Sequence, residues 1–256
     1  PSGVQTRRAL PGHTHAPPSP AGVYTVKLDL DIQKTLTSGT RSFTLSVQLQ
    51  SEHQRIVIVG ASGSGKSLTL QALAGLLRPD SGHIRLDGDT LFDAAQNIWL
   101  PAQERRLAYV FQDYALFAHL TVYQNVAFAL STGWRNPPRH AQRAQWPASV
   151  ARWLDLFGLA ALAGQYPSEL SGGQRQRTAL ARALVTEPRA LLLDEPFSAL
   201  DPTLRTTMRT ELLALQERLQ VPMILITHDP EDATALGQHV VEMRNGGLIG
   251  QSITQG

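Results

Sequence analysis

The sequence contains no cysteine, so neither disulfides nor thiolate metal sites are available to its 256 residues. Long apolar runs are also missing: a run such as residues 190–193 falls far short of the roughly 20 residues that span a bilayer, so we expect any membrane role to depend on a partner. Lysine and arginine form no polybasic run, and a formal net charge of +2 gives no argument for nucleic-acid binding. Hydrophobic residues make up 42% of the chain, which is enough to bury a substantial core.

The first 22 residues are rich in proline, glycine, serine and threonine without apolar periodicity, which predicts a disordered leader. They contain no apolar segment of the kind found in secretory signals. His13 and His15 lie here, but two histidines without further ligands favour a solvated tail over a metal site. We expect one domain over residues 23–250, followed by a tail at 251–256.

A glycine-rich segment at residues 60–67 follows the apolar run 55–59 and precedes a helical pattern. Its sequence, GASGSGKS, fits the pattern G-x-x-x-x-G-K-[ST], in which backbone N–H groups at a helix N-terminus surround phosphate oxygens. We therefore predict that Lys66 contacts the β- and γ-phosphates of a nucleotide and that Ser67 binds Mg²⁺. The predicted nucleotide contacts are Gly60, Ala61, Ser62, Gly63, Ser64, Gly65, Lys66, Ser67 and Leu68.

The remaining periodicities predict an α/β fold in three parts. Polar and apolar residues alternate over 24–31 and 43–49 around a turn at 38–39, which predicts a small antiparallel sheet. Residues 83–88 read as an edge strand closed by a turn. Helical spacing predominates from about residue 114 to 187 and predicts a helical lobe. Apolar strands alternating with helices predict a parallel-sheet core with its ligand at the carboxyl edge.

Polar residues stand at the ends of several predicted core strands. Asp194 and Glu195 follow the apolar run 190–193, where the first carboxylate can hold Mg²⁺ and the second can activate a water as general base. Gln112 ends another strand and indicates a group aimed into a site, although a surface glutamine is the simpler alternative. His228 ends a third apolar strand.

Ser171 and two glycines precede an amphipathic helical pattern. This arrangement predicts a second phosphate-binding helix N-terminus, with Ser171 as N-cap or phosphate donor, and an ordinary capped helix is the alternative. The residues concerned are Ser171, Gly172, Gly173 and Gln174.

Taken together, these motifs resemble those of the ATP-binding subunit of ABC transporters, over roughly Tyr24 to Gly250. Five motifs occur in that family's order: the Walker A loop 60–67, the Q-loop Gln112, the signature 170–174, the Walker B and D-loop residues 194–201, and the switch His228. The resemblance implies a P-loop NTPase fold with a helical signature lobe, and ATP and Mg²⁺ as cofactors. It also implies a homodimer or paired subunits in which the signature residues of one copy contact ATP bound by the other.

The resemblance further assigns roles to individual residues. Glu195, His228 and Gln112 would be catalytic, and His228 would contact the γ-phosphate. Mg²⁺ would be held by Ser67, Gln112 and Asp194. Asp201 would act across the dimer interface, and the aromatic that stacks on adenine would be Phe43, or else Tyr24.

The implied function is that of an ATP-hydrolysing motor subunit at the cytoplasmic face of the inner membrane. Its partners would be integral-membrane permease subunits and, through them, a periplasmic solute-binding protein. Residues 91–113 resemble ATPases of bacterial importers, particularly those for molybdate and related oxyanions. An exporter subunit and a soluble ABC ATPase acting on nucleic acid are the alternatives. The absence of an Asn-Lys-x-Asp motif and the presence of the signature argue against a GTPase or a small-molecule kinase.

Four apolar residues after Gln112 allow two interpretations. They could form the family's docking groove for a permease helix, or they could belong to the core of the helical lobe. These residues are Tyr114, Leu116, Phe117 and Leu120.

Overall fold

The computed structural model describes residues 27–131, 136–139 and 142–253, so the predicted leader, with His13 and His15, and Tyr24 lie outside the described residues. The strands are β1 (Leu28–Ser38), β2 (Arg41–Ser51), β3 (Arg55–Val59), β4 (Ser81–Leu86), β5 (Asp89–Asp93), β6 (Ile98–Trp99), β7 (Leu107–Val110), β8 (Ala190–Asp194), β9 (Met223–Thr227), β10 (His239–Arg244) and β11 (Gly247–Ile253). The α-helices are α1 (Lys66–Ala74), α2 (Val122–Phe128), α3 (Ala148–Leu156), α4 (Gly172–Leu184), α5 (Pro202–Leu219) and α6 (Pro230–Leu236).

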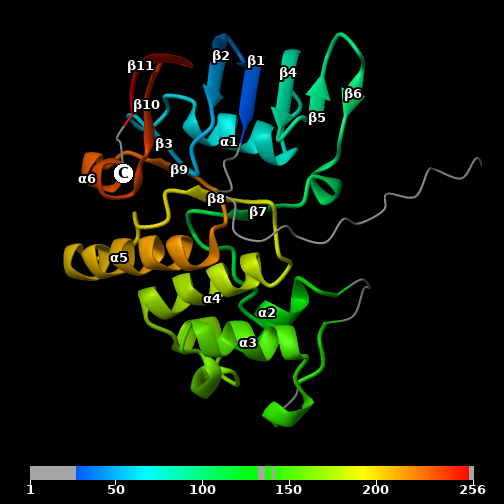
Figure 1. Cartoon of the computed structure of the whole chain (residues 1–256), viewed down its shortest axis with the longest axis vertical. Helices are drawn as coiled ribbons and strands as arrows, with labels where there is room; N and C mark the ends of the chain where they lie inside the picture. The colour runs from blue at the N-terminus through cyan, green and yellow to red at the C-terminus, as the bar shows by residue number, and fades with distance from the viewer. Residues whose placement is uncertain (1–26, 132–135, 140–141, 254–256) are drawn as a thin grey trace, which may run out of the picture.

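The strands form one mixed sheet in the order β6-β5-β4-β1-β2-β11-β10-β3-β9-β8-β7 (Figure 1). Strands β10, β3, β9, β8 and β7 are parallel to one another, whereas each pair of adjacent strands among β2, β1, β4, β5 and β6 is antiparallel. Strand β11 joins the two parts, because it pairs along β10 and meets β2 at Gly247 and Ser46. The predicted parallel core and antiparallel subdomain are therefore confirmed.

Strand β4 does not lie at an edge, and the prediction of an edge strand at residues 83–88 is wrong. It pairs with β1 on one side and with β5 on the other. The chain folds back after the turn at Asp87 and Gly88 and covers the outer side of β4 with β5 and β6. Ile84 and Leu86 are fully buried as a result.

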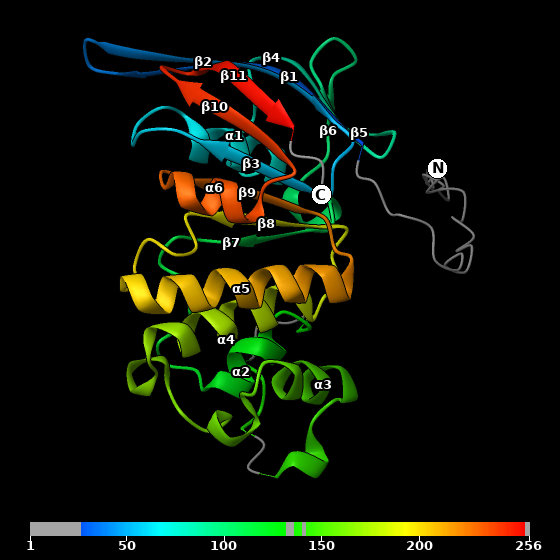
Figure 2. The ribbon, with the colours of Figure 1, turned by 60° about the vertical axis from the view of Figure 1, so that its left-hand side comes forward.

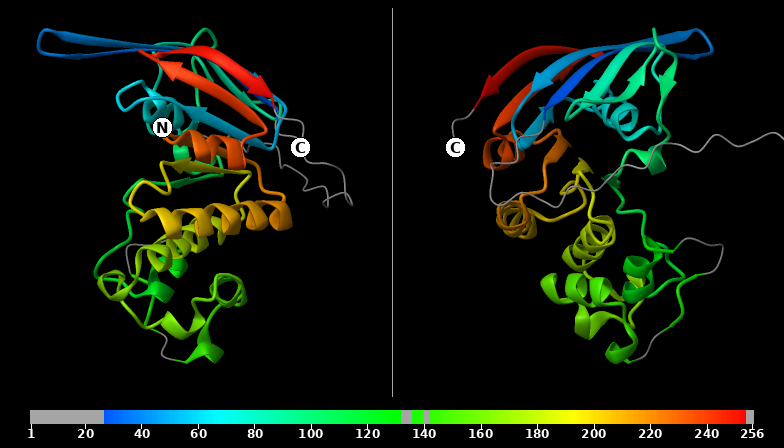
Figure 3. Two further views of the ribbon diagram at one scale, coloured as in Figure 1. Left: turned by 90° about the vertical axis from the view of Figure 1, so that its left-hand side faces the viewer. Right: turned by 45° about the vertical axis from the view of Figure 1, so that its right-hand side comes forward.

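Side-chain alternation along the parallel strands divides the core in two. In β3, Ile56 and Ile58 join an apolar cluster with α1 and the antiparallel strands, whereas Val57 joins a second cluster with α4, α5 and α6. Figures 2 and 3 show the consequence: α1 lies between the antiparallel strands and the parallel core, and α2, α3 and α4 form the opposite end of the molecule. The start of α1, where a phosphate would bind, is thus fixed between two packed layers.

One strand extends into the segment for which a tail is predicted. Strand β11 continues to Ile253, three residues into that segment. Helix α5 begins at Pro202 because the Asp201 carboxylate accepts a hydrogen bond from the Leu204 N–H at 3.0 Å and proline is suited to the first helical position. Within the described ranges, no helix combines the length and apolar character needed to cross a bilayer.

The carboxyl end of α1 is held by the fully buried Arg105. Its Nη1 donates to the carbonyl oxygens of Ala72 and Leu73 at 2.8 and 2.7 Å, and its Nε donates to that of Leu100 at 2.8 Å. The guanidinium also lies 4.6 Å from the centre of the Trp99 ring. Burial lowers the pKa of Arg105 to about 10, which leaves it charged at neutral pH. One side chain therefore ties the helix end to the β5–β6 region.

Replacing Arg105 with methionine should destabilise the protein by about 3 kcal/mol, because several buried carbonyl groups lose a charged donor. For a chain of this size we expect Tm to fall by roughly 10 °C. Thermal unfolding followed by circular dichroism measures the change. The matched control is Arg106→Met, because Arg106 is exposed. Equal Tm values for the two variants would show that the buried hydrogen bonds contribute little.

Candidate functional site

The glycine loop turns from the end of β3 into α1 through backbone positions that require glycine. The Gly60 N–H donates to the carbonyl of Thr227 at 3.2 Å, and a Cβ at Gly60 would lie 2.3 Å from the carbonyl oxygen of Met243. Gly65 has a φ of 109°, in the left-handed region. The loop is therefore packed against β9 and β10 before α1 begins.

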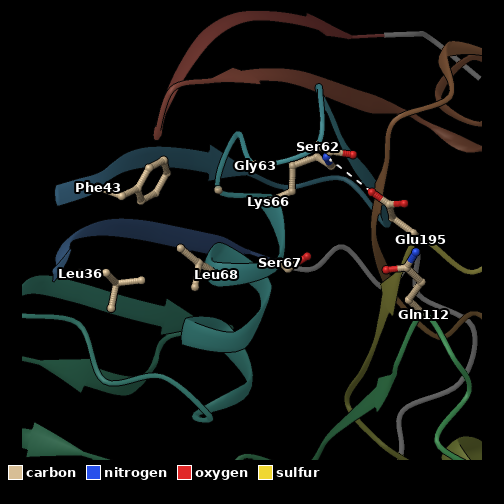
Figure 4. Close-up of a pocket in the computed structure, with 10 residues that line it drawn as sticks. Leu36, Phe43, Ser62, Gly63, Lys66, Ser67, Leu68, Gln112 and Glu195 are labelled. Carbon is tan, nitrogen blue, oxygen red and sulfur yellow. Dashed lines mark ion pairs between the residues drawn. The ribbon is translucent and has the colours of Figure 1, made fainter. Parts of the chain in front are cut away.

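Lys66 extends into this loop, and its side chain is only 4% exposed. Its Nζ donates to the carbonyls of Gly60 and Ala61 at 2.8 and 3.0 Å and lies 3.6 Å from Glu195 Oε1. The dashed line in Figure 4 marks the ion pair between Lys66 and Glu195. A buried ammonium needs such partners because its desolvation is costly. The cation therefore lies at the centre of the loop, where the sequence predicts a phosphate.

Two oxygen groups suited to Mg²⁺ meet beside the loop. Ser67 Oγ donates to Asp194 Oδ1 at 3.1 Å, which joins the first turn of α1 to the end of β8. The buried Ser64 hydroxyl in the same loop has no hydrogen-bond partner among the described residues. A hydroxyl and a carboxylate are the hard oxygen ligands that Mg²⁺ prefers, so the residues fit this ion.

Glu195 follows Asp194 with a φ of 46°, which is uncommon for a residue other than glycine. Its N–H donates to the carbonyl of Ile226 at 2.9 Å, and the Ser198 hydroxyl donates to its carbonyl at 2.9 Å. The side chain is 12% exposed, and its Oε2 lies 2.9 Å from His228 Nδ1. The unusual backbone directs the Glu195 carboxylate away from Asp194 and toward both Lys66 and His228.

Thr227 and Asp229, on either side of His228, are held by a network that includes Asp232 and Arg209. Thr227 Oγ1 donates to Asp232 Oδ2 at 2.6 Å, and the Asp229 N–H donates to Thr227 Oγ1 at 3.0 Å. Arg209 of α5 forms ion pairs with Asp229 and Asp232, at 2.7 and 2.5 Å. Although burial opposes the change, hydrogen bonds and the nearby arginines lower the pKa of Asp229, so it stays ionised at neutral pH.

A pocket of about 380 Å³ opens between the loop, the β1–β2 hairpin and the end of β7. Its lining residues are Leu36, Phe43, Ser62, Gly63, Gly65, Lys66, Ser67, Leu68, Gln112 and Glu195. Figure 4 shows Phe43 and Leu36 on one side of the loop and Gln112 with Glu195 on the other. The apolar pair can contact a base while the polar groups contact phosphates. Phe43 stays the predicted adenine contact, since Tyr24 is not described.

The signature residues lie on another element and do not line this pocket. Ser171 caps α4: its Oγ accepts from the Gln174 N–H at 3.3 Å, and Gln174 Oε1 accepts from the Ser171 N–H at 2.8 Å. Gly172 and Gly173 begin the helix, and a Cβ at Gly173 would lie 3.3 Å from Leu204. Within one copy the segment is a capped helix that lies outside the pocket of its own chain.

The four apolar residues after Gln112 are predicted to form either a docking groove for a permease helix or part of the core of the helical lobe, and they differ in exposure. Tyr114 and Leu120 are 4% and 2% exposed and belong to the core of the molecule. Leu116 and Phe117 are only half-buried. A docking role for this segment can therefore rest on the second pair alone.

Several contributors to the site are not predicted from the sequence. Leu36 lies opposite Phe43 in the β1–β2 hairpin. Counting the strand pairing outward from the turn predicted at 38–39 could have identified Leu36 as the neighbour of Phe43. Tyr109 donates to Asp194 Oδ2 at 2.7 Å from the neighbouring strand, which no local pattern indicates. Arg209 and Asp232 hold the residues on either side of His228 in place. No local sequence pattern predicts these contacts either.

The sequence profile of the ABC transporter family matches residues 43–198. The chain is 48% identical over 191 residues to the sulfate/thiosulfate import ATP-binding protein CysA of Gloeobacter violaceus, covering 75% of this chain and 52% of the relative. It is 45% identical over 195 residues to the protein of that name in Escherichia coli K12, covering 76% and 51%. The chain thus spans about half the length of the curated relatives that it matches.

Solved structures give the same assignment. The chain is similar, with a TM-score of 0.71 and 28% identity, to a dimeric post-hydrolysis state of the ATP-binding cassette MJ0796 bound to ADP and Pi. The similarity covers 90% of this chain and 99% of that one. The family predicted from the five motifs is therefore confirmed, and the chain belongs to the ABC transporter family as an ATP-binding domain.

Proposed function

We propose that the chain hydrolyses ATP as the motor subunit of an ABC transporter. The observation that carries the proposal is the position of Glu195, whose carboxylate lies 2.9 Å from His228 and 3.6 Å from Lys66. The Ser67–Asp194 pair lies beside it and joins the first turn of α1 to the end of β8. A carboxylate base, a cation for phosphate and oxygen ligands for Mg²⁺ therefore surround one pocket.

This arrangement suits attack of water on the γ-phosphorus. Lys66 and the N–H groups of the loop would hold the phosphates, which positions the γ-phosphate and stabilises its negative charge. Glu195 would accept the proton of the attacking water, and His228 would keep that carboxylate oriented while contacting the γ-phosphate. Gln112, across the pocket and two residues beyond the end of β7, would be a further catalytic residue. Mg²⁺, held by Ser67, Asp194 and Gln112, would neutralise phosphate charge.

The proposal includes a head-to-tail dimer, with Ser171, Gly172, Gly173 and Gln174 completing the site of the other copy. Two features support it: the signature does not line the pocket of its own chain, and the similar cassette MJ0796 is described as dimeric with ADP and Pi. Asp201 would contribute to the same interface from the start of α5. Closure on ATP and opening after hydrolysis would convert loss of the γ-phosphate into movement of the lobes.

Mixing two inactive variants tests the shared site. Ser171→Arg blocks the signature and Lys66→Ala disables the loop, so a mixed dimer keeps one complete site, and we expect ATPase activity that neither variant shows alone. Phosphate release from the mixture measures this. The control is Lys66→Ala mixed with Glu195→Gln, because both residues act in the same copy and no complete site results. Absence of activity in the first mixture would contradict the dimer.

We also propose that the transporter imports an oxyanion, working at the cytoplasmic face of the inner membrane with permease subunits and a periplasmic solute-binding protein. The support is the identity of 45–48% to sulfate/thiosulfate import proteins. Uptake of labelled sulfate, thiosulfate and molybdate should fall when the gene is deleted in its native host. Uptake should return with the wild-type gene but not with the Glu195→Gln variant. Unchanged uptake of all three would argue against this cargo class.

A further inference from the structure

Both oxygens of the Asp194 carboxylate are bound, each from a different side of β8. Ser67 of α1 donates to Oδ1 at 3.1 Å, and the hydroxyl of Tyr109 in β7 donates to Oδ2 at 2.7 Å. Strand β7 is the parallel neighbour of β8, with Tyr109 opposite Leu192. The short hydrogen bond therefore joins the last strand of the sheet to the carboxylate that fits Mg²⁺.

The tyrosine itself is held in place on two sides. Its ring packs against Phe111, with centres 4.4 Å apart, and the Gln71 side chain lies near its hydroxyl. Gln71 lies four residues after Ser67, so both side chains are on the same face of α1. The ring packing therefore holds the hydroxyl at the position from which it donates to Asp194 Oδ2.

We propose that Tyr109 is a positioning residue that orients Asp194 for Mg²⁺, an inference that rests on the proposed function. With Asp194 Oδ2 fixed by the phenol, Oδ1 remains directed at the Ser67 hydroxyl. Asp194 Oδ1 and Ser67 Oγ are the two oxygens that would hold the metal. Hydrogen bonds to metal-binding carboxylates orient them and increase metal affinity. Because Gln112 follows Tyr109 by three residues, just beyond the end of β7, the same segment also leads to a second predicted ligand of Mg²⁺.

The alternative is that Tyr109 serves only to fill space beside β8. Phenylalanine would fill the same volume and keep the contact with Phe111, so the hydroxyl alone separates the two roles. The decisive quantity is therefore metal binding in Tyr109→Phe rather than turnover.

The experiment titrates Mn²⁺, a spectroscopic substitute for Mg²⁺, into the protein with a non-hydrolysable ATP analogue and follows bound metal by electron paramagnetic resonance. We expect Tyr109→Phe to weaken metal binding roughly 10-fold. Binding of the analogue in EDTA and the Tm should stay at wild-type values, because the loop and the packing are unchanged. Tyr123→Phe is the matched control, since Tyr123 is a buried tyrosine in α2 that does not line the pocket.

Each other outcome has a definite meaning. Equal metal affinity in Tyr109→Phe and wild type would overturn the inference. An equal loss of nucleotide binding with and without metal would also overturn it, because the hydroxyl would then support the loop as a whole. A wild-type chain that binds no nucleotide would overturn the proposed function and the inference with it.

Discussion

Replacing Glu195 with glutamine should lower ATP turnover by about 10²- to 10⁴-fold, the range typical of a lost general base. The amide has the shape of the carboxylate but cannot accept the proton of the attacking water. Nucleotide binding should persist, because Lys66 keeps its two loop carbonyls and Ser67 keeps Asp194. ATP bound without hydrolysis should then hold the two copies together.

Phosphate release gives the loss of turnover, and size-exclusion chromatography with and without Mg-ATP gives the dimer. We expect a shift to dimer only with Mg-ATP. Glu217→Gln is a suitable control, because Glu217 is an exposed glutamate on α5 outside the pocket. If Glu195→Gln and Glu217→Gln hydrolyse ATP at the same rate, Glu195 is not the general base. A monomer with ATP demonstrably bound would contradict dimer closure by this chain alone.

The parts of the site that lie on short local patterns could be predicted from the sequence. The glycine loop and the strand-end residues Asp194, Glu195 and His228 are specified by a few adjacent residues each. Their meeting at one sheet edge follows from the parallel order of β3, β8 and β9, which the alternation of strands and helices already indicates. The pocket is therefore largely a consequence of local sequence combined with one topological rule.

The remaining parts depend on the register between distant segments. Tyr109 reaches Asp194 only because β7 pairs with β8 in one register, and a shift by one residue would turn the phenol to the other face. The enclosed position of β4 depends in the same way on β5 and β6 folding back, which the turn at 87–88 alone does not dictate. The proposed contacts of the signature with nucleotide would involve a second copy and cannot be read from one chain.

The Lys66 ammonium takes part in two sets of contacts, one with the loop carbonyls and one with Glu195. Substituting Lys66 alone tests its part in phosphate binding separately from the role of Glu195 in turnover. The ammonium closes the loop through the carbonyls of Gly60 and Ala61, and it lies 3.6 Å from the Glu195 carboxylate. A phosphate bound at the loop would compete for the same ammonium. Nucleotide affinity should therefore depend on Lys66 far more than on Glu195, whose proposed partner is the attacking water rather than the phosphates.

Accordingly, Lys66→Ala should weaken ATP binding by about 100-fold, because hydrogen bonds to a charged group contribute about 3 kcal/mol at their upper range. Fluorescence anisotropy with a labelled ATP analogue measures the dissociation constant, and the Tm shows whether the loop stays folded. Lys27→Ala provides the comparison, since the Lys27 side chain is 71% exposed. Affinity near that of Lys27→Ala would show that the loop N–H groups hold the phosphates without the lysine. A 100-fold loss with a retained Tm would establish that Lys66 binds the phosphates directly, since the loop would then be intact and only the cation missing.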